Sequence, residues 1–256
     1  GTIFNFVLGF GLFGTTLMIP VMCQNLLHFT AMQTGLLMLP GSLATAFIMP
    51  VVGSLLKKNF VHPAIYAGIG LIMFFIFSWM MGQLNTEIGS NDFFWPLMLR
   101  GFAMGLIFIP LTTISLSNLE GKQIPQGTAL SNMVRQLGGS IGIALITTYL
   151  TRETATHYAY LAENVTAYNN ESQQRINTLT NGFISKGYDA ASATKAAYAS
   201  ISGSISRQAA FLTYRDLFIY LGIFFLLLVP FLVLFRNKKK KAAATGEPEH
   251  VEWAME

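Results

Sequence analysis

Two arginines inside apolar segments are the residues of this sequence most able to do chemistry. Arg100 lies seven residues into one apolar run, about 10 Å deep at 1.5 Å per residue, and Arg135 lies a similar distance or more into the next run. A charge buried in a bilayer costs at least roughly 2.5 kcal/mol unless it is paired. Two interpretations stay open for each guanidinium. It snorkels to the nearest membrane surface, or it joins a gating or cavity-lining network with backbone carbonyls and Gln136.

Acidic groups are rarer still within the apolar runs. Asp216 is the one acid that touches such a run, and the preceding Arg215 offers it a salt bridge at the membrane interface. The sequence contains no metal-binding cluster, nucleophile–base pair, glycine-rich phosphate loop or cysteine motif. Because an active site would need such groups, we expect no enzymatic activity, no metal and no cofactor.

These polar groups belong to an unusually apolar chain of 256 residues, 52% hydrophobic and 11% charged, with a mean hydropathy of +0.49. Soluble domains carry about 25% charged residues, so the composition excludes a soluble enzyme, a disordered chain and a secreted disulfide scaffold. The single cysteine, Cys23, cannot form an internal disulfide. The net charge of +4 does not indicate nucleic-acid binding, because five of the sixteen basic residues crowd into 236–241, as at a cytoplasmic membrane flank. We predict an all-α integral membrane protein.

The apolar runs predict a bundle of six transmembrane helices, at about 2–24, 34–56, 63–84, 93–117, 127–150 and 214–235. The short connections alternate in charge. Those at 25–33 and 83–92 carry no Lys or Arg, whereas 57–62, 118–126 and 236–241 together carry eight. The excess of positive charge on cytoplasmic loops then places the start of the first span and the tail 237–256 in the cytoplasm, in a multi-pass protein of the cell membrane.

The segment 151–213 is predicted to be a long extracytoplasmic loop. Its alanine-rich part, Asp189 to Phe211, contains few helix breakers and is expected to be helical. We expect a helical cap or hairpin at the membrane surface that serves either as a spacer or as a docking surface or gate. The tail from residue 236 onward is basic and then acidic, which is typical of disorder.

Small residues and prolines recur inside the predicted spans. Gly101 and Gly105 are four residues apart, as are Gly138 and Gly142, so each pair opens one helix face to close backbone approach. Packing alone explains these pairs, and helices that slide or rock during transport would use the same faces. Pro110 removes a backbone hydrogen bond and favours a kink.

Several strings of residues resemble a known family of transporters. They are Pro20-x-x-x-Gln24, the run LLMLPG from Leu36 to Gly41, Arg100-Gly101-x-x-x-Gly105-x-x-x-x-Pro110, and Arg135-Gln136-Leu137-Gly138-Gly139-Ser140-Ile141-Gly142. Together they resemble the C-terminal half of major facilitator superfamily transporters, in the branch of fourteen-span drug:proton antiporters. The resemblance covers about residues 2–235. The connection after the second run departs from the family pattern, since Lys57 and Lys58 keep its positive charge while its acid is absent.

The resemblance implies a twelve-helix core of two six-helix bundles, of which this chain is the second. It implies proton-coupled efflux of amphipathic drugs or similar compounds across the cytoplasmic (inner) membrane. The implied partners are a small amphipathic substrate, protons, the lipid bilayer, the N-terminal bundle of the same protein and, in some members, a periplasmic adaptor protein. The residues assigned to the substrate path or gating are Gln24, Arg100, Arg135, Gln136 and Asp216.

Two alternatives stay open beside multidrug efflux. The first is an exporter of a natural metabolite, lipid or siderophore in the same fold, and the second is a non-transporting, truncated membrane scaffold. A proton-coupled carrier needs a desolvated carboxylate that changes protonation. Since Asp216 would be held ionised by Arg215, we expect the main proton-binding carboxylate to lie in the N-terminal bundle, outside this chain.

Overall fold

The computed structural model describes residues 2–58, 61–84, 89–117, 119, 121, 123–163, 165 and 169–244, with side chains except those of 90, 91 and 233–244. Its helices are α1 (Thr2–Asn25), α2 (Ala31–Lys57), α3 (Pro63–Gly82), the 3-10 helix η1 (Ser90–Phe93), α4 (Phe94–Leu116), α5 (Gln123–Glu163), α6 (Asn170–Ile184) and α7 (Ala190–Ala244). No strand occurs among the described residues. The predicted all-α class is confirmed.

Local signals in the sequence explain where two of these helices begin. The Thr30 hydroxyl accepts a hydrogen bond from the Gln33 backbone at 3.2 Å, and the Gln33 side chain accepts one from the Thr30 backbone at 2.9 Å. This reciprocal capping box satisfies two backbone donors at the start of α2. At α3, Pro63 occupies the first turn, where its missing N–H costs nothing, and His62 caps the helix through its ring nitrogen.

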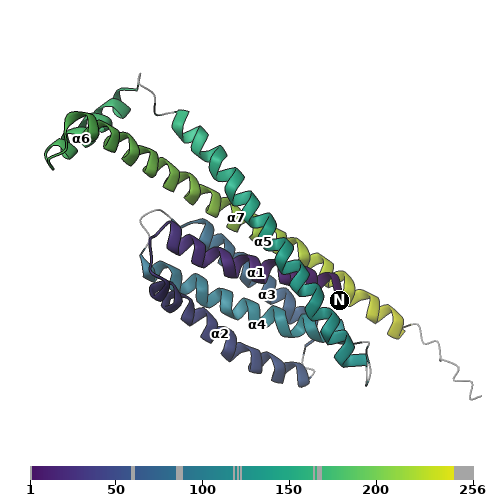
Figure 1. Ribbon diagram of the computed structural model, residues 1–256. Coiled ribbons are helices and arrows are strands. Elements are labelled where there is room, and N and C mark those ends of the chain that lie inside the picture. The colour runs from purple at the N-terminus through teal and green to yellow at the C-terminus, as the bar shows by residue number, and fades with distance from the viewer. Residues whose placement is uncertain are drawn as a thin grey trace, which may run out of the picture.

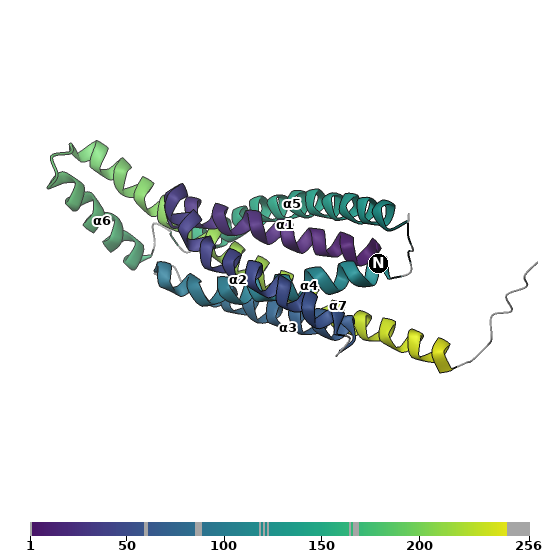
Figure 2. The same cartoon turned by 90° about the horizontal axis from the view of Figure 1, so that it is seen from below.

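Within the described part of the chain, five helices are long and apolar enough to cross a membrane: α1, α2, α3, α4 and the 190–232 part of α7. In α5, Asn132, Arg135 and Gln136 lower the hydropathy of the segment for which we predict a span, so the span at 127–150 stays a prediction. Its geometry supports that prediction. α5 packs along α1 and runs in the same direction (Figures 1 and 2), and a helix packed along a spanning helix crosses the same layer.

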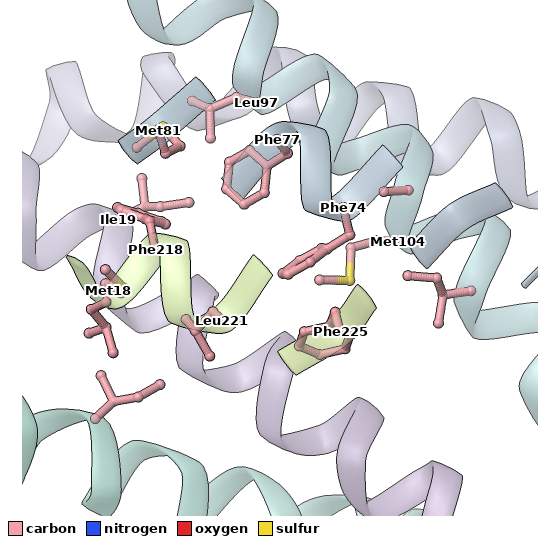
Figure 3. Packing of buried hydrophobic residues seen from close by; sticks show 14 of the residues in the cluster. Met18, Ile19, Phe74, Phe77, Met81, Leu97, Met104, Phe218, Leu221 and Phe225 are labelled. Atoms are coloured by element: carbon pink, nitrogen blue, oxygen red, sulfur yellow. The ribbon is translucent and has the colours of Figure 1, made fainter. Parts of the chain in front are cut away.

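The helices alternate in direction, with α1, α3 and α5 running one way and α2, α4 and α7 the other (Figures 1 and 2). α3 packs against both α4 and α7, α2 packs against α4, and α5 packs against α1 and α7. The central cluster contains Met18, Ile19, Phe74, Phe77, Met81, Leu97, Met104, Phe218, Leu221 and Phe225 (Figure 3). Aromatic contacts join α3 to α7, with the Phe74 and Phe225 ring centroids 4.5 Å apart. In a bilayer such contacts act through close packing rather than through burial from water.

The predicted outer loop is built almost entirely of helix. α5 continues to Glu163, α6 follows, and the alanine-rich segment is helical as predicted. That segment is not a separate cap, because it is the first part of α7 and continues into the last predicted span. The outer parts of α5 and α7, with α6, project beyond the ends of the other helices instead of lying over them (Figure 1).

The C-terminal end of α7 also differs from the prediction. The sequence predicts disorder from residue 236, whereas α7 continues to Ala244. Alanine and lysine are good helix formers, which extends the helix beyond the apolar run. The remaining part of the predicted tail, 245–256, lies outside the described residues.

Candidate functional site

Arg100 links α4 to α1 through hydroxyl groups. One of its terminal nitrogens donates hydrogen bonds to the hydroxyls of Thr16 at 2.6 Å and Thr15 at 3.3 Å. The Arg100 Nε is buried and has no acceptor within the described structure. No acidic side chain of the described residues pairs with this guanidinium. Its charge is therefore only partly satisfied, by neutral groups of one neighbouring helix.

Arg135 is buried, with 8% of its surface exposed. Its guanidinium donates a hydrogen bond to the Asn132 side chain on the same helix. The guanidinium carbon also lies 4.5 Å from the centroid of the Phe108 ring on α4, a cation–π contact. The sequence predicts Gln136 as the partner, but the Gln136 side chain is exposed on a neighbouring face of α5. Adjacent residues of a helix point about 100° apart, which explains the difference.

The two arginine environments meet on one face of α4. Arg100, Met104 and Phe108 are spaced four residues apart, so they share a face, with about 12 Å of helix between the first and the last. Further along α4, the hydroxyl of Ser115 accepts a hydrogen bond at 2.8 Å from the fully buried Asn5 of α1. This face carries the polar contacts of α4 with α1 and the cation–π contact with α5.

Sequence reasoning missed several of the groups just described, among them Asn5, Thr16 and Phe108. Asn5 and the threonine pair at 15–16 are polar residues within an otherwise apolar run, and that is a signal which could have found them. Phe108 had no such signal, because one phenylalanine among many gives no sign that a cation lies over its ring.

Gln24 lies exposed near the end of α1. Thr16, Pro20 and Gln24 recur every four residues, so they lie along one side of α1. The Thr16 hydroxyl on this side binds Arg100. The structure thus brings the predicted residues Gln24 and Arg100 to the same side of the α1–α4 pair. The hydrogen bonds of Arg100 in the described part of the chain go to Thr15 and Thr16, not to Gln24.

Asp216 pairs with His157 rather than with the predicted Arg215. The His157 Nε2 and Asp216 Oδ2 atoms are 3.2 Å apart, and this is the one contact between a basic and an acidic side chain in the described part of the chain. Arg215 is exposed, because neighbouring residues on a helix do not face each other. Asp216 lies near the C-terminal end of α3, because Gly82 packs against Arg215 and Ile219 of α7. Its contact with His157 joins α7 to the extension of α5.

The predicted glycine pairs lie at close contacts between helices. A Cβ atom added at Gly138 would lie 2.1 Å from the carbonyl oxygen of Phe6 on α1, and Gly142 lies against Phe10. On α4, Gly101 approaches the Gly41 carbonyl oxygen of α2 in the same way, and Gly105 lies against Ile48. The Thr45 hydroxyl of α2 donates a hydrogen bond to the Gly101 carbonyl at 3.0 Å. Pro110 is buried inside α4, which continues through it to Leu116.

One face of α5 is polar and exposed. Asn132, Gln136, Ser140 and Thr147 recur on one side of the helix, and all four side chains are exposed. Arg135 borders this row and is buried beside it. The Ser140 and Thr147 hydroxyls donate hydrogen bonds to backbone carbonyls of α5 itself. Hydrocarbon cannot satisfy the exposed Gln136 amide, so this side of α5 is a surface for which lipid is an unsuitable neighbour.

Comparison with known proteins places this geometry in context. Residues 2–143 match the family model described as Major Facilitator Superfamily. The chain is 33% identical to the "Uncharacterized MFS-type transporter YhcA" of Bacillus subtilis (strain 168) over 162 residues, which cover 63% of this chain and 30% of the relative. It is 28% identical to the "Fatty acid resistance protein FarB" of Neisseria gonorrhoeae over 224 residues, 87% of this chain and 42% of the relative.

A third relative is the "Multidrug export protein EmrB" of Escherichia coli (strain K12). The chain is 30% identical to it over 168 residues, which cover 65% of this chain and 32% of the relative. The chain therefore spans less than half the length of these three relatives.

Proposed function

Because the chain belongs to the major facilitator superfamily, we propose that it forms the C-terminal six-helix bundle of a proton-coupled exporter of amphipathic compounds. Its apolar helices and its transporter relatives support a multi-pass membrane protein. The short coverage of those relatives supports a second bundle elsewhere in the same polypeptide. Export of drug-like compounds is favoured by the similarity to a protein named for multidrug export.

The observation that carries the proposal is the exposed polar row on α5. Gln136 and Ser140 lie at membrane depth if α5 spans, yet they face away from the bundle. Since substrate paths of this architecture lie between two bundles near the bilayer midplane, a second bundle and an aqueous path are the neighbours that such a row requires. We retain Gln136 as a path residue on this ground rather than as a partner of Arg135.

Arg100 is proposed to contact the substrate. It carries a positive charge beside Thr16, and no acid of the described residues neutralises it. A guanidinium in this position favours substrates with an anionic or strongly accepting group. A second candidate substrate class is therefore the amphipathic carboxylates, which the similarity to a fatty acid resistance protein over most of the chain also favours.

Arg135 is proposed to act in gating rather than in substrate contact, because it is buried against α4. Breaking or re-forming the contact with Phe108 would accompany any movement of α5 relative to α4. In full-length protein, Arg135→Lys should retain more export than Arg135→Leu, because Lys keeps the charge while it loses the planar group. Equal export by Leu and wild type at matched expression would remove Arg135 from the gate.

The main proton-binding carboxylate is proposed to lie in the other bundle. Asp216 lies at the start of the predicted sixth span and is paired with His157, so it is poorly placed to face both sides of the membrane in turn. Asp216→Asn in the full-length protein should leave proton-driven export in vesicles in place. Loss of that export, with gradient-free substrate exchange intact, would make Asp216 the coupling acid.

The projecting helices are the proposed contact for a periplasmic adaptor. The outer part of α5, α6 and the first part of α7 extend beyond the bundle, where they are accessible to a partner outside the membrane. This assignment supports a docking surface over a spacer for segment 151–213.

The experiment that tests the proposal measures thiol accessibility along α5. In a cysteine-free version of the full-length gene product, Gln136→Cys and Ser140→Cys should react with a membrane-impermeant thiol reagent, and substrate should slow the reaction. Leu227→Cys on α7 is the matched control, since Leu227 is 62% exposed on an apolar helix and should stay unreactive in lipid.

Two outcomes would count against the proposal. Equal, slow labelling at all three positions would place the polar row in lipid and remove its role in a path. Dye efflux above the vector control in cells that express residues 1–256 alone would show that one bundle is enough for transport, and would overturn the two-bundle assignment.

A further inference from the structure

A second feature of α5 is an apolar groove between this helix and α7, on the opposite side from the polar row. The groove has a volume of about 590 Å³. Its apolar wall is formed by Phe10, Leu145, Ile146, Leu217, Leu221 and Phe224. α5 and α7 lie side by side at this level in both views (Figures 1 and 2). At about 100° per residue, the groove residue Leu145 points roughly opposite to Gln136, so the groove lies outside the proposed substrate path.

The polar groups of the groove gather at its outer end. Arg152 and Glu153 of α5 line that end, and neither forms an ion pair within the described structure. Just below them, the rings of Tyr149 and Tyr220 meet edge to face with centroids 6.0 Å apart. Tyrosines are enriched at the level where lipid headgroups meet hydrocarbon. This outer end, which we call the mouth of the groove, thus contains one cation (Arg152), one anion (Glu153) and the rings of Tyr149 and Tyr220.

The dimensions of the groove match the outer half of a bilayer. From Leu145 to Glu153 the helix rises about 12 Å, which reaches from within the outer half of the hydrocarbon core, roughly 15 Å thick, to the headgroup level. Because the predicted span ends at residue 150, Arg152 and Glu153 lie at the outer headgroup level and Leu145 lies beside acyl chains. The wall and the mouth therefore face the two chemically different parts of one lipid molecule.

We propose that the α5–α7 groove is a binding site for phosphatidylethanolamine. One acyl chain lies along the apolar wall, the Arg152 guanidinium donates hydrogen bonds to the phosphate, and the Glu153 carboxylate accepts hydrogen bonds from the primary ammonium. Phosphatidylglycerol has no cation for Glu153, and its negative charge is repelled there. The quaternary ammonium of phosphatidylcholine has no N–H to donate.

A second groove of the bundle shows what the charges add. The space between α2 and α4, lined by residues that include Leu36, Leu43, Phe47 and Phe102, has a volume of about 630 Å³ and no charged residue in its lining. An acyl chain can occupy it, but nothing there distinguishes one headgroup from another. The two grooves thus provide a matched comparison within one protein.

The test measures lipid-dependent stability of the purified chain in detergent. Heating exposes the buried thiol of Cys23, which a thiol-reactive dye reports. Dioleoylphosphatidylethanolamine should raise the melting midpoint by about 3 °C or more above equal amounts of dioleoylphosphatidylcholine or dioleoylphosphatidylglycerol. Arg152→Gln and Glu153→Gln should each abolish this difference.

Groove-filling variants supply the control. Leu145→Trp fills the α5–α7 groove and Leu43→Trp fills the other, at side chains that are 58% and 49% exposed. Only Leu145→Trp should abolish the preference for phosphatidylethanolamine, with lipid-free midpoints close to wild type in both variants. Native mass spectrometry should show retained phosphatidylethanolamine on wild type and Leu43→Trp, and its loss from Leu145→Trp.

Three results would overturn the proposal. Equal shifts with all three lipids would show that the headgroup is not recognised, and a preference that survives both Gln variants would place recognition elsewhere. Loss of the preference in the full-length gene product, with the preference present in residues 1–256, would mean that another segment of the protein covers the groove.

Discussion

Gly138 on α5 is the position where one added methyl group should separate two helices. A Cβ atom there would lie 2.1 Å from the carbonyl oxygen of Phe6 on α1, whereas ordinary contacts begin at 3.4 Å. A backbone oxygen cannot rotate away as a side chain can. α1 and α5 must therefore move about 1.3 Å apart to accept alanine, and the rest of their contact loosens with them.

The size of the effect follows from this displacement. A gap of about 0.5–1 Å forfeits a quarter to a half of the dispersion energy across it, and overpacked substitutions cost about 1–3 kcal/mol. Since the shift exceeds 1 Å, we expect Gly138→Ala to cost about 2–3 kcal/mol. Gly142→Ala should cost about 1 kcal/mol, because its closest contacts, the ring edge of Phe10 at 2.9 Å and the Phe10 backbone at 3.1 Å, require a shift of only about 0.5 Å. Gly68→Ala on α3 meets nothing within 4 Å and should gain up to about 1 kcal/mol from helix propensity.

The chain contains its own reporter for this series. Cys23 is the single cysteine of the sequence and is fully buried on α1, so a thiol-reactive dye follows unfolding without any introduced label. The melting temperature shifts by about 2–4 °C per kcal/mol of stability. Gly138→Ala should therefore melt several degrees below wild type, and Gly142→Ala at a temperature between those of Gly138→Ala and wild type. Gly68→Ala should melt at or above the temperature of wild type. If Gly138→Ala melted with Gly68→Ala, the close approach of α1 and α5 would be wrong.

Three further predictions concern single contacts. A double-mutant cycle of Phe108→Leu and Arg135→Met should give a coupling energy of about 1 kcal/mol in the same melting assay, and no coupling would deny the cation–π contact. Thr16→Val should destabilise the chain by about 1 kcal/mol through the lost hydrogen bond to Arg100, while Thr16→Ser should not. Asp189 accepts hydrogen bonds from Ser192, the third residue of α7, and these lower the pKa of its carboxyl group below the ordinary 3.8. The stability that Asp189 gives to the start of α7 is therefore fully present above pH 3.8. It is lost as the pH falls through the lower pKa of the folded state. By circular dichroism at neutral pH, Asp189→Ala should reduce helicity and Asp189→Asn should retain it.

The types and order of the helices could be predicted from the sequence because their signals are local. The capping pair Thr30 and Gln33, and Pro63 at the first turn of α3, mark helix starts within a few residues. The glycine pairs could also be predicted, since four-residue spacing fixes a common face on any helix. The helix that each glycine pair contacts could not be predicted. That Gly138 meets α1 while Gly101 meets α2 depends on how all the helices pack.

The partners of the charged residues were beyond sequence reasoning for the same physical reason. Adjacency in sequence suggested Arg215 for Asp216 and Gln136 for Arg135, yet adjacent residues point about 100° apart on a helix. The actual contacts come from elsewhere: His157 lies 59 positions before Asp216, and Phe108 lies on another helix. Such pairs form only after two helices have docked, so the rotation of each helix decides them.

α5 shows why one hydropathy value fails for a helix between two environments. Its polar residues keep it out of the set of helices apolar enough to span, although it packs along α1, which qualifies. Asn132 and Gln136 are exposed on one side, while Leu145 on the opposite side lines an apolar groove. Averaging over the whole helix mixes a side suited to lipid with a side suited to protein or water. A helix at the boundary between a lipid-facing groove and a transport path needs that mixture, so its low hydropathy supports the proposed position rather than counting against a span.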